Sequence, residues 1–155
     1  MKRLALLACA VLAAACSSGP KVNIIQPELQ MYQLVGPADL NYPSGAIEVQ
    51  FGLRIANKSG ETIKLRKIDL TPVGLGGPYT VRRRGYFFNE EVPPGGSKEV
   101  SFWVRADAEG DANANDANAP VSLRAVALFE SPAGSFRSIL MKTFNQRGGG
   151  AVEGQ

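Results

Sequence analysis

The sequence contains no histidine, and both of its cysteines, Cys9 and Cys16, lie within the first 16 residues. A chain without histidine lacks the usual general base near neutral pH and the commonest zinc ligand. The sequence after Cys16 contains no thiol, so it can form no disulfide and offers no cysteine nucleophile. We therefore expect a protein that is not an enzyme and that uses neither a metal nor another cofactor.

The sequence also lacks a large excess of charge of one sign. It has 17 basic and 14 acidic side chains, and setting aside Lys2 and Arg3 leaves 15 basic ones. A surface balanced in this way does not indicate a nucleic-acid partner. The one continuous apolar run, Leu4 to Ala15, is shorter than the roughly 20 residues that a membrane-spanning helix needs.

The start of the chain is typical of a secretory signal: the basic Met1-Lys2-Arg3, an apolar run, and small residues before a cysteine. The segment Leu12-Ala13-Ala14-Ala15-Cys16 resembles the lipobox of bacterial lipoproteins, in which Leu is most frequent at the position of Ala13. This resemblance implies cleavage before Cys16, diacylglycerol attached to its thiol, palmitate as part of the lipid anchor, and a place in the cell envelope. Ser17 is compatible with sorting to the outer membrane, facing the periplasm. An ordinary cleaved signal is the alternative.

These features divide the chain into four parts. Residues 1–15 are assigned to the signal peptide and residues 16–21 to the lipidated terminus and a short linker. Residues 22–145 form a single domain, which is long enough to bury a core. Residues 146–155, which include Gly148-Gly149-Gly150, are assigned to a flexible tail.

The domain reads as β-structure almost throughout. Ala46 to Ala56 alternates large apolar with polar or small residues, which predicts a strand with Ile47, Val49, Phe51, Leu53 and Ile55 on its buried face. An entry strand interrupted at Pro27 is expected over Val22–Ile25 and Leu29–Val35. Further strands are expected at Thr62–Leu70, Tyr79–Val81, Tyr86–Phe88, Lys98–Arg105, Val121–Phe129 and Phe136–Phe144, the last two as a hairpin joined by Ser131-Pro132-Ala133-Gly134. A change of inward parity between Leu65 and Ile68 predicts a bulge. About seven short strands with these turn signals favour one antiparallel immunoglobulin-like or fibronectin-III-like β-sandwich.

Arg82-Arg83-Arg84, followed by Tyr86, is the first candidate site. Guanidinium groups bind phosphates and carboxylates in pairs, so these residues predict a patch for an anionic ligand or an acidic partner. The alternative is an edge strand that is protected from pairing by its charge.

Trp103 is the second candidate, because it lies opposite the apolar face of its strand. We interpret it either as a buried core residue or as an exposed aromatic anchor for a partner. The acidic stretch 107–118 has oxygen side chains at alternate positions but lacks the spacing of an EF-hand, so a solvated loop is preferred to a calcium site. Glu90 and Glu91 should point apart, which does not favour acid–base catalysis.

Four segments resemble late-embryogenesis-abundant type 2 domains: Asn57-Lys58-Ser59, Ile63-x-Leu65-x-x-Ile68-x-Leu70, Val92 to Ser97, and Val100 to Val104. The likeness covers about Lys21 to Phe144. It implies a non-enzymatic sandwich with a protective or accessory role and supplies no site residues.

The leading functional expectation is an outer-membrane lipoprotein whose periplasmic β-sandwich binds another envelope protein in an accessory or assembly role. Two alternatives remain: a stress-protective envelope protein, and a module that binds anionic lipid or glycan through Arg82 to Arg84.

Overall fold

The computed structural model describes residues 24–36, 45–74, 77–108 and 120–145, which contain strands and no helix. The strands are β1 (Glu28–Val35), β2 (Gly45–Ala56), β3 (Ile63–Pro72), β4 (Tyr79–Val81), β5 (Arg84–Val92), β6 (Ser97–Ala108), β7 (Val121–Ser131) and β8 (Gly134–Phe144). The signal peptide, Cys16, the linker, the tail and most of the acidic loop lie outside the described residues. Within them, no helix is long and apolar enough to cross a membrane.

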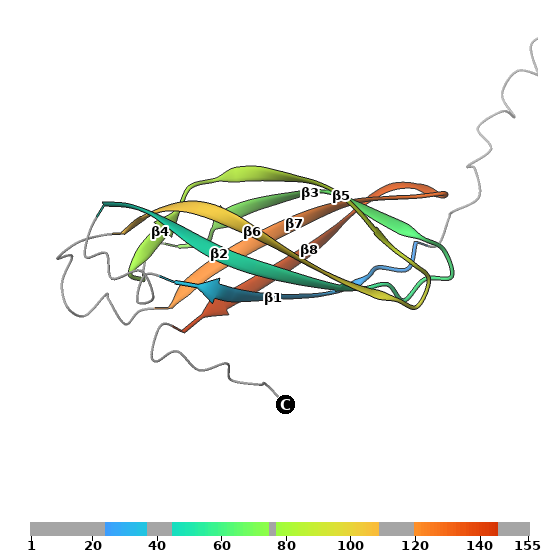
Figure 1. Cartoon of the computed structure of the whole chain (residues 1–155), viewed down its shortest axis with the longest axis horizontal. Coiled ribbons are helices and arrows are strands. Elements are labelled where there is room, and N and C mark those ends of the chain that lie inside the picture. The colour runs from blue at the N-terminus through green and yellow to red at the C-terminus, as the bar shows by residue number, and fades with distance from the viewer. Residues whose placement is uncertain (1–23, 37–44, 75–76, 109–119, 146–155) are drawn as a thin grey trace, which may run out of the picture.

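The strands form two four-stranded antiparallel sheets that pack face to face, which confirms the predicted sandwich (Figure 1). Sheet A has the order β1-β2-β6-β4, and sheet B has the order β5-β3-β7-β8. The short strand β4 joins sheet A, and β5, which follows it directly, joins sheet B. The chain therefore crosses from one sheet to the other at Arg82-Arg83.

The alternation of β2 supplies the centre of the core. All five of its predicted inward residues are buried, and Phe51 packs its ring 5.3 Å from that of Phe144 on sheet B. The inward residues of β6 and β7 complete the same core. A period of two in the sequence thus becomes one apolar face per sheet, with the two faces pressed together.

Local irregularities also follow the sequence. The register of β3 against both neighbours shifts between Leu65 and Lys67, which confirms the predicted bulge. The predicted hairpin is present, with Ser131 paired to Gly134, whose φ of 120° suits a glycine. Pro27 directly precedes the edge strand β1, and Ile24 to Pro27 are not in a strand. The described residues contain eight strands, close to the expected number of about seven, and β4 and β5 are separate, as the segments Tyr79–Val81 and Tyr86–Phe88 were expected to be.

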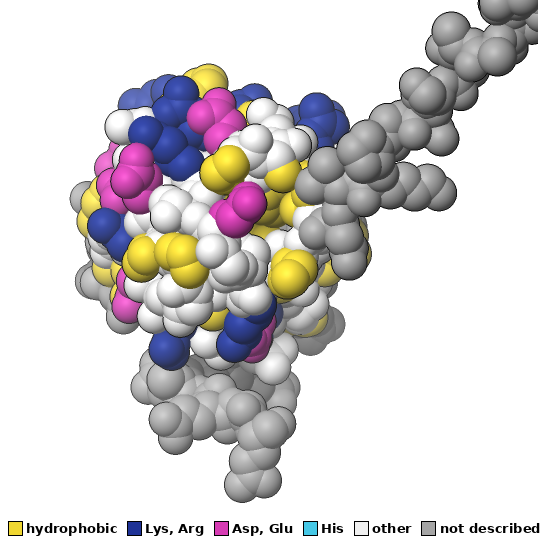
Figure 2. All heavy atoms as spheres, turned by 90° about the vertical axis from the view of Figure 1, so that its right-hand side faces the viewer, with side chains coloured by type: hydrophobic (Ala, Val, Ile, Leu, Met, Phe, Trp, Pro, Cys, Tyr) yellow, Lys and Arg dark blue, Asp and Glu magenta, His cyan; other side chains and the backbone are white. Residues whose placement is uncertain are grey.

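The two sheets are tied together at the end where the described chain begins, here called the linker end. Asn57 is a buried polar side chain whose amide donates hydrogen bonds to the carbonyls of Glu61, Val92 and Pro93 at 2.8–3.0 Å. Its Oδ1 accepts from the backbone and hydroxyl of Ser59. One side chain therefore joins the β2–β3 turn to the β5–β6 turn. Acidic, basic and apolar side chains are interspersed over this end (Figure 2).

Candidate functional site

The outer face of sheet A carries Trp103. This residue is 50 % exposed and lies opposite Gln50 of β2, so it is not part of the core. The interpretation of Trp103 as a buried core residue is therefore wrong, because its strand alternation turns it outward and no described element covers that face. Its exposure is compatible with an aromatic anchor.

A second aromatic ring lies on the same face. Tyr32 of β1 pairs with Gly52 of β2 and lies across it, so that a Cβ on Gly52 would come within 2.3 Å of the ring. Gly52 is also opposite Ser101 of β6. The absence of a side chain at residue 52 is what allows the tyrosine to lie flat over the sheet.

The arginine run does not act as one unit. Arg82 donates two hydrogen bonds of 2.8 Å to the carboxylate of Asp107, and this bidentate bond lowers the pKa of Asp107 and raises that of Arg82. Arg83 and Arg84 are exposed and form no ion pair with any residue that the structure describes. Arg82 thus lies on the outer side of sheet A, as Trp103 does. Arg83 and Arg84 lie where the chain crosses between the sheets.

Tyr86 is separated from the arginines by its orientation. It packs inward against Phe102, with ring centroids 5.0 Å apart. Its hydroxyl is buried and has no hydrogen-bond partner among the described residues. Burial raises the pKa of this phenol, and the charge of Arg84 opposes that rise. The tyrosine therefore lies in the seam between β5 and β6 rather than on an open basic patch.

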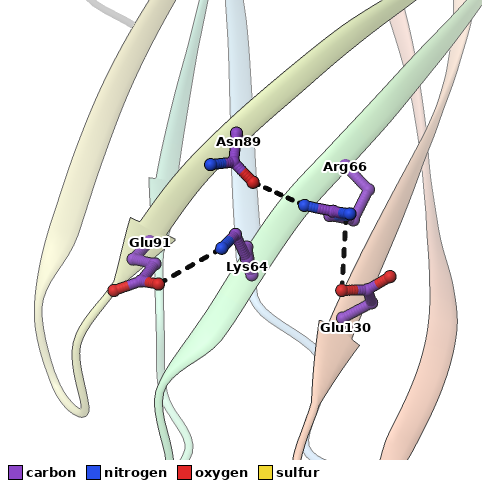
Figure 3. Close-up of polar contacts among 5 residues, drawn as sticks. All are labelled: Lys64, Arg66, Asn89, Glu91 and Glu130. Atoms are coloured by element: carbon purple, nitrogen blue, oxygen red, sulfur yellow. Dashed lines mark hydrogen bonds and ion pairs between the residues drawn. The ribbon is translucent and has the colours of Figure 1, made fainter.

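On sheet B, the part of the outer face near the linker end is covered by ion pairs between side chains of opposite charge. Lys64 binds Glu91 at 3.3 Å, while Arg66 binds Glu130 at 3.3 Å and also donates to Asn89 (Figure 3). The neighbouring Glu90 faces the other way and binds Lys98 of β6 at 2.9 Å. Glu90 and Glu91 therefore point apart, as predicted, and each has its own lysine.

Farther along the same face, apolar side chains are exposed. Phe87 is 81 % exposed, Ile139 58 % and Met141 63 %. Ile139 lies opposite Val126 of β7, and Leu128 lies one rung away. We call these five residues the sheet B patch: Phe87, Val126, Leu128, Ile139 and Met141.

Basic groups border the sheet B patch. Arg137 lies opposite Leu128, and Arg124 lies opposite Met141. Both are exposed, and neither forms an ion pair with a described residue. Lys67 is instead neutralised by Asp69 at 2.8 Å and lies over the ring of Phe87 at 5.6 Å. The patch therefore combines exposed apolar surface with two uncompensated positive charges.

The patch was not among the sequence-predicted candidates, although the sequence contains its signal. Strand β8 has apolar residues at both parities, with Phe136 and Phe144 inward and Ile139 and Met141 outward. Likewise, Phe87 lies between two inward aromatic residues and must point outward. Apolar residues on both sides of a strand leave apolar surface exposed on its outer face. Such surface can mark a site where another molecule binds.

One groove of about 220 Å³ lies at the linker end and is lined mainly by Ile24, Ile25, Ile63 and Phe136. Among the described residues there is no cluster of acidic, cysteine or histidine side chains that could hold a metal. Asp107 is the first residue of the acidic stretch 107–118 and lies within the described part of the chain. Its carboxylate accepts hydrogen bonds from Arg82.

No family model and no curated protein matches this chain. Among solved structures, a protein from Archaeoglobus fulgidus has 12 % identity and a TM-score of 0.50, covering 79 % of this chain and 98 % of its own. The Northeast Structural Genomics Consortium target SoR45 has 13 % identity and a TM-score of 0.49, covering 84 % of this chain and 92 % of its own. At these identities the first likeness concerns the fold alone.

Proposed function

We propose that this protein is a lipid-anchored component of a bacterial cell envelope whose β-sandwich binds another envelope protein through the sheet B patch. The observation that carries the proposal is the exposure of Ile139 and Met141 on β8 and of Phe87 on β5, at the two edges of one sheet face. Leu128 and Val126 of β7 lie between them. Exposed apolar surface of this kind marks interaction sites in soluble domains.

The lipid anchor is supported by the resemblance of residues 12–16 to a lipobox. Seven residues lie between Cys16 and Ile24. The eight Cα–Cα steps from Cys16 to Ile24 span at most about 27 Å when fully extended. The domain would therefore stay close to the membrane, where an envelope protein partner is also found. Cys16→Ser should abolish metabolic labelling with palmitate, and persistent labelling of that variant would contradict the assignment.

Binding through the sheet B patch is tested by photo-crosslinking in intact cells that produce the full chain. A photoreactive amino acid in place of Thr143, which is exposed beside Met141, should give a discrete adduct of higher mass. Ile139→Ser together with Met141→Ser should reduce this adduct by at least about tenfold, because the apolar contact is removed.

The matched control places the photoreactive residue at Gln30, which is exposed on the outer face of sheet A. We expect no adduct, or one that does not respond to the two serine substitutions. Equal, substitution-sensitive adducts from both positions would indicate general stickiness, and no adduct at Thr143 would remove support for this partner surface.

A further inference from the structure

Strand β6 has an open edge along most of its length. It is twelve residues long, but on the side away from β2 it pairs only with the three residues of β4, at Ala106 to Ala108. One further hydrogen bond joins the backbone N–H of Arg82 to the carbonyl of Arg105 at 3.1 Å. In the part of the chain that the structure describes, no strand pairs with this side of β6 from Ser97 to Val104.

The backbone groups at this edge can be assigned. In an antiparallel strand the N–H and C=O of one residue point to the same side, and the side alternates with each residue. Because the carbonyl of Arg105 faces Arg82, the backbone groups of Trp103, Ser101 and Glu99 face the same open edge. These residues therefore offer three donors and three acceptors in the repeat that another strand would match.

The inner side of this edge is incompletely closed. Val100 and Phe102 are 7 % and 8 % exposed, whereas the five inward residues of β2 are 3 % or less. Phe102 contacts Tyr86 and Phe88 of β5 across the seam, at 5.0 and 5.8 Å between ring centroids. The buried hydroxyl of Tyr86, which has no partner among the described residues, lies in the same seam.

Charge gives the edge a direction. Arg83, close to the end of the edge at Arg105, is exposed and has no ion pair with a described residue. At the opposite end Glu99 is exposed, while Lys98 is already neutralised by Glu90 at 2.9 Å. A strand lying here would meet the uncompensated positive charge of Arg83 at one end, whereas at the other end Glu99 lies opposite Arg54. Trp103, half exposed on the outer face, would cover its middle.

We propose that the open edge of β6 takes up an extended segment of another protein as an added antiparallel strand beside Glu99 to Val104. The complementary segment carries a carboxylate at its amino-terminal end, next to Arg83, and alternates apolar residues toward the seam with polar residues outward. Main-chain hydrogen bonds supply affinity in this mode, and the alternate side chains supply specificity. The inference depends neither on the lipid anchor nor on the sheet B patch.

The first test is amide hydrogen exchange of the purified full chain. The N–H groups of Glu99, Ser101 and Trp103 should exchange rapidly, whereas those of Val100 and Phe102, which face β2, should be protected. This alternation should not depend on protein concentration. Uniform protection at every concentration would show that the chain covers its own edge. Protection that grows with concentration would show a second copy there; either result overturns the proposal.

The second test uses the geometry of proline. A photoreactive residue in place of Glu99 should give an adduct with another protein in intact cells. Ser101→Pro removes one outward N–H without breaking the pairing with β2, and it should reduce the adduct at least about tenfold. Ser101→Ala keeps the N–H and should leave the adduct unchanged. Arg83→Glu, which cannot disturb the strand, should also weaken the adduct.

The adduct from Thr143 serves as the control for folding and for the sheet B patch. None of the three variants Ser101→Pro, Ser101→Ala and Arg83→Glu should change it. An adduct from Glu99 that survives Ser101→Pro, or that contains two copies of this chain, overturns the proposal. The absence of any adduct from Glu99 does so as well. Loss of the Thr143 adduct in otherwise unchanged cells would count against the proposed function and not against the open edge.

Discussion

The outer faces of the two sheets contrast in how their charges and apolar groups are arranged. On sheet A, Glu48 lies opposite Arg105 and Arg54 lies opposite Glu99, so charges of opposite sign share a rung. On sheet B, charge pairs lie near the linker end and at Lys67–Asp69, whereas the β8 side of the face exposes Ile139 and Met141 beside the unpaired Arg124 and Arg137.

This difference shows why a sandwich need not present equivalent surfaces. Both inner faces obey the same demand, which is to bury apolar residues at every second position. The outer faces need not bury apolar residues, so their composition depends on other requirements, such as solubility or the binding of a partner. A rung-by-rung balance of charge is sufficient for solubility, whereas exposed apolar groups with uncompensated cations favour association with a partner of complementary chemistry.

The largest effect on stability should come from removing the hydrogen bonds of Asn57 that join the two sheets. The two outer faces can be compared only while the sheets are held together. Asn57→Ala removes the donors to three carbonyls, two of which belong to the β5–β6 side of the linker end. We expect the free energy of unfolding to fall by about 3 kcal/mol, since the carbonyls lose their partner in a mostly buried place. Urea unfolding of the purified chain measures this loss.

A matched control for Asn57 is Ser59→Ala. It removes a hydroxyl that donates to Asn57 Oδ1 and contacts the exposed backbone of Glu61, and it should cost about 1 kcal/mol or less. Similar losses for both variants would mean that the turn as a whole, and not the amide donors of Asn57, ties the sheets together.

A smaller effect on the free energy of unfolding should distinguish the two faces, because each sheet contains a glycine over which a side chain lies. A Cβ at Gly52 on sheet A would come within 2.3 Å of the Tyr32 ring, and one at Gly85 on sheet B within 2.5 Å of Lys67 Cε. Gly52→Ala should cost about 1 kcal/mol, because an aromatic ring loses its packing. The Cβ at Gly85 would also come within 2.8 Å of Asp69 Oδ1, which is the ion-pair partner of Lys67. Gly85→Ala should stay within about 0.5 kcal/mol of the parent, because the ends of these two part-exposed side chains can move together.

Urea unfolding of both alanine variants provides the comparison. Equal losses would show that the two faces do not differ in how tightly their side chains pack, and a larger loss at Gly85 would reverse the contrast.

The sequence predicted most of the strands, the inward residues of β2 and the bulge of β3, because each of these depends on a local period of two. It was wrong at Ile24 and Ile25, which were expected in a strand and are not in one. It did not predict which strands would be neighbours. The short β4 pairs with β6, and β5 pairs with β3, through contacts between residues distant in sequence. The open edge of β6 depends on those pairings, so no local pattern could reveal it.

The candidate residues show the same limit. Alternation placed Trp103 opposite the apolar face, but its exposure depends on whether another element covers sheet A. The arginine run was visible as a motif, yet the partner of Arg82 is Asp107, 25 residues away on β6. A patch read from consecutive letters is therefore divided by the fold into one paired and two unpaired arginines.

The smallest expected effect concerns pH and the one bidentate ion pair of sheet A. The hydrogen bonds from Arg82 hold the pKa of Asp107 below its usual range in the folded state. A carboxyl group with a lowered folded pKa stabilises the fold above its unfolded pKa of about 3.9, and this contribution is lost as the pH falls through the lower folded value. The melting temperature of the parent should therefore exceed that of Asp107→Asn at pH 7 by no more than about 2 °C, since the pair is exposed to solvent. The difference should close as the pH is lowered below about 4. Melting curves of both chains between pH 7 and pH 2 check this sign. A difference that grows toward acid would mean that Asp107 is stabilised in its protonated form, and the charge balance inferred for sheet A would then need revision.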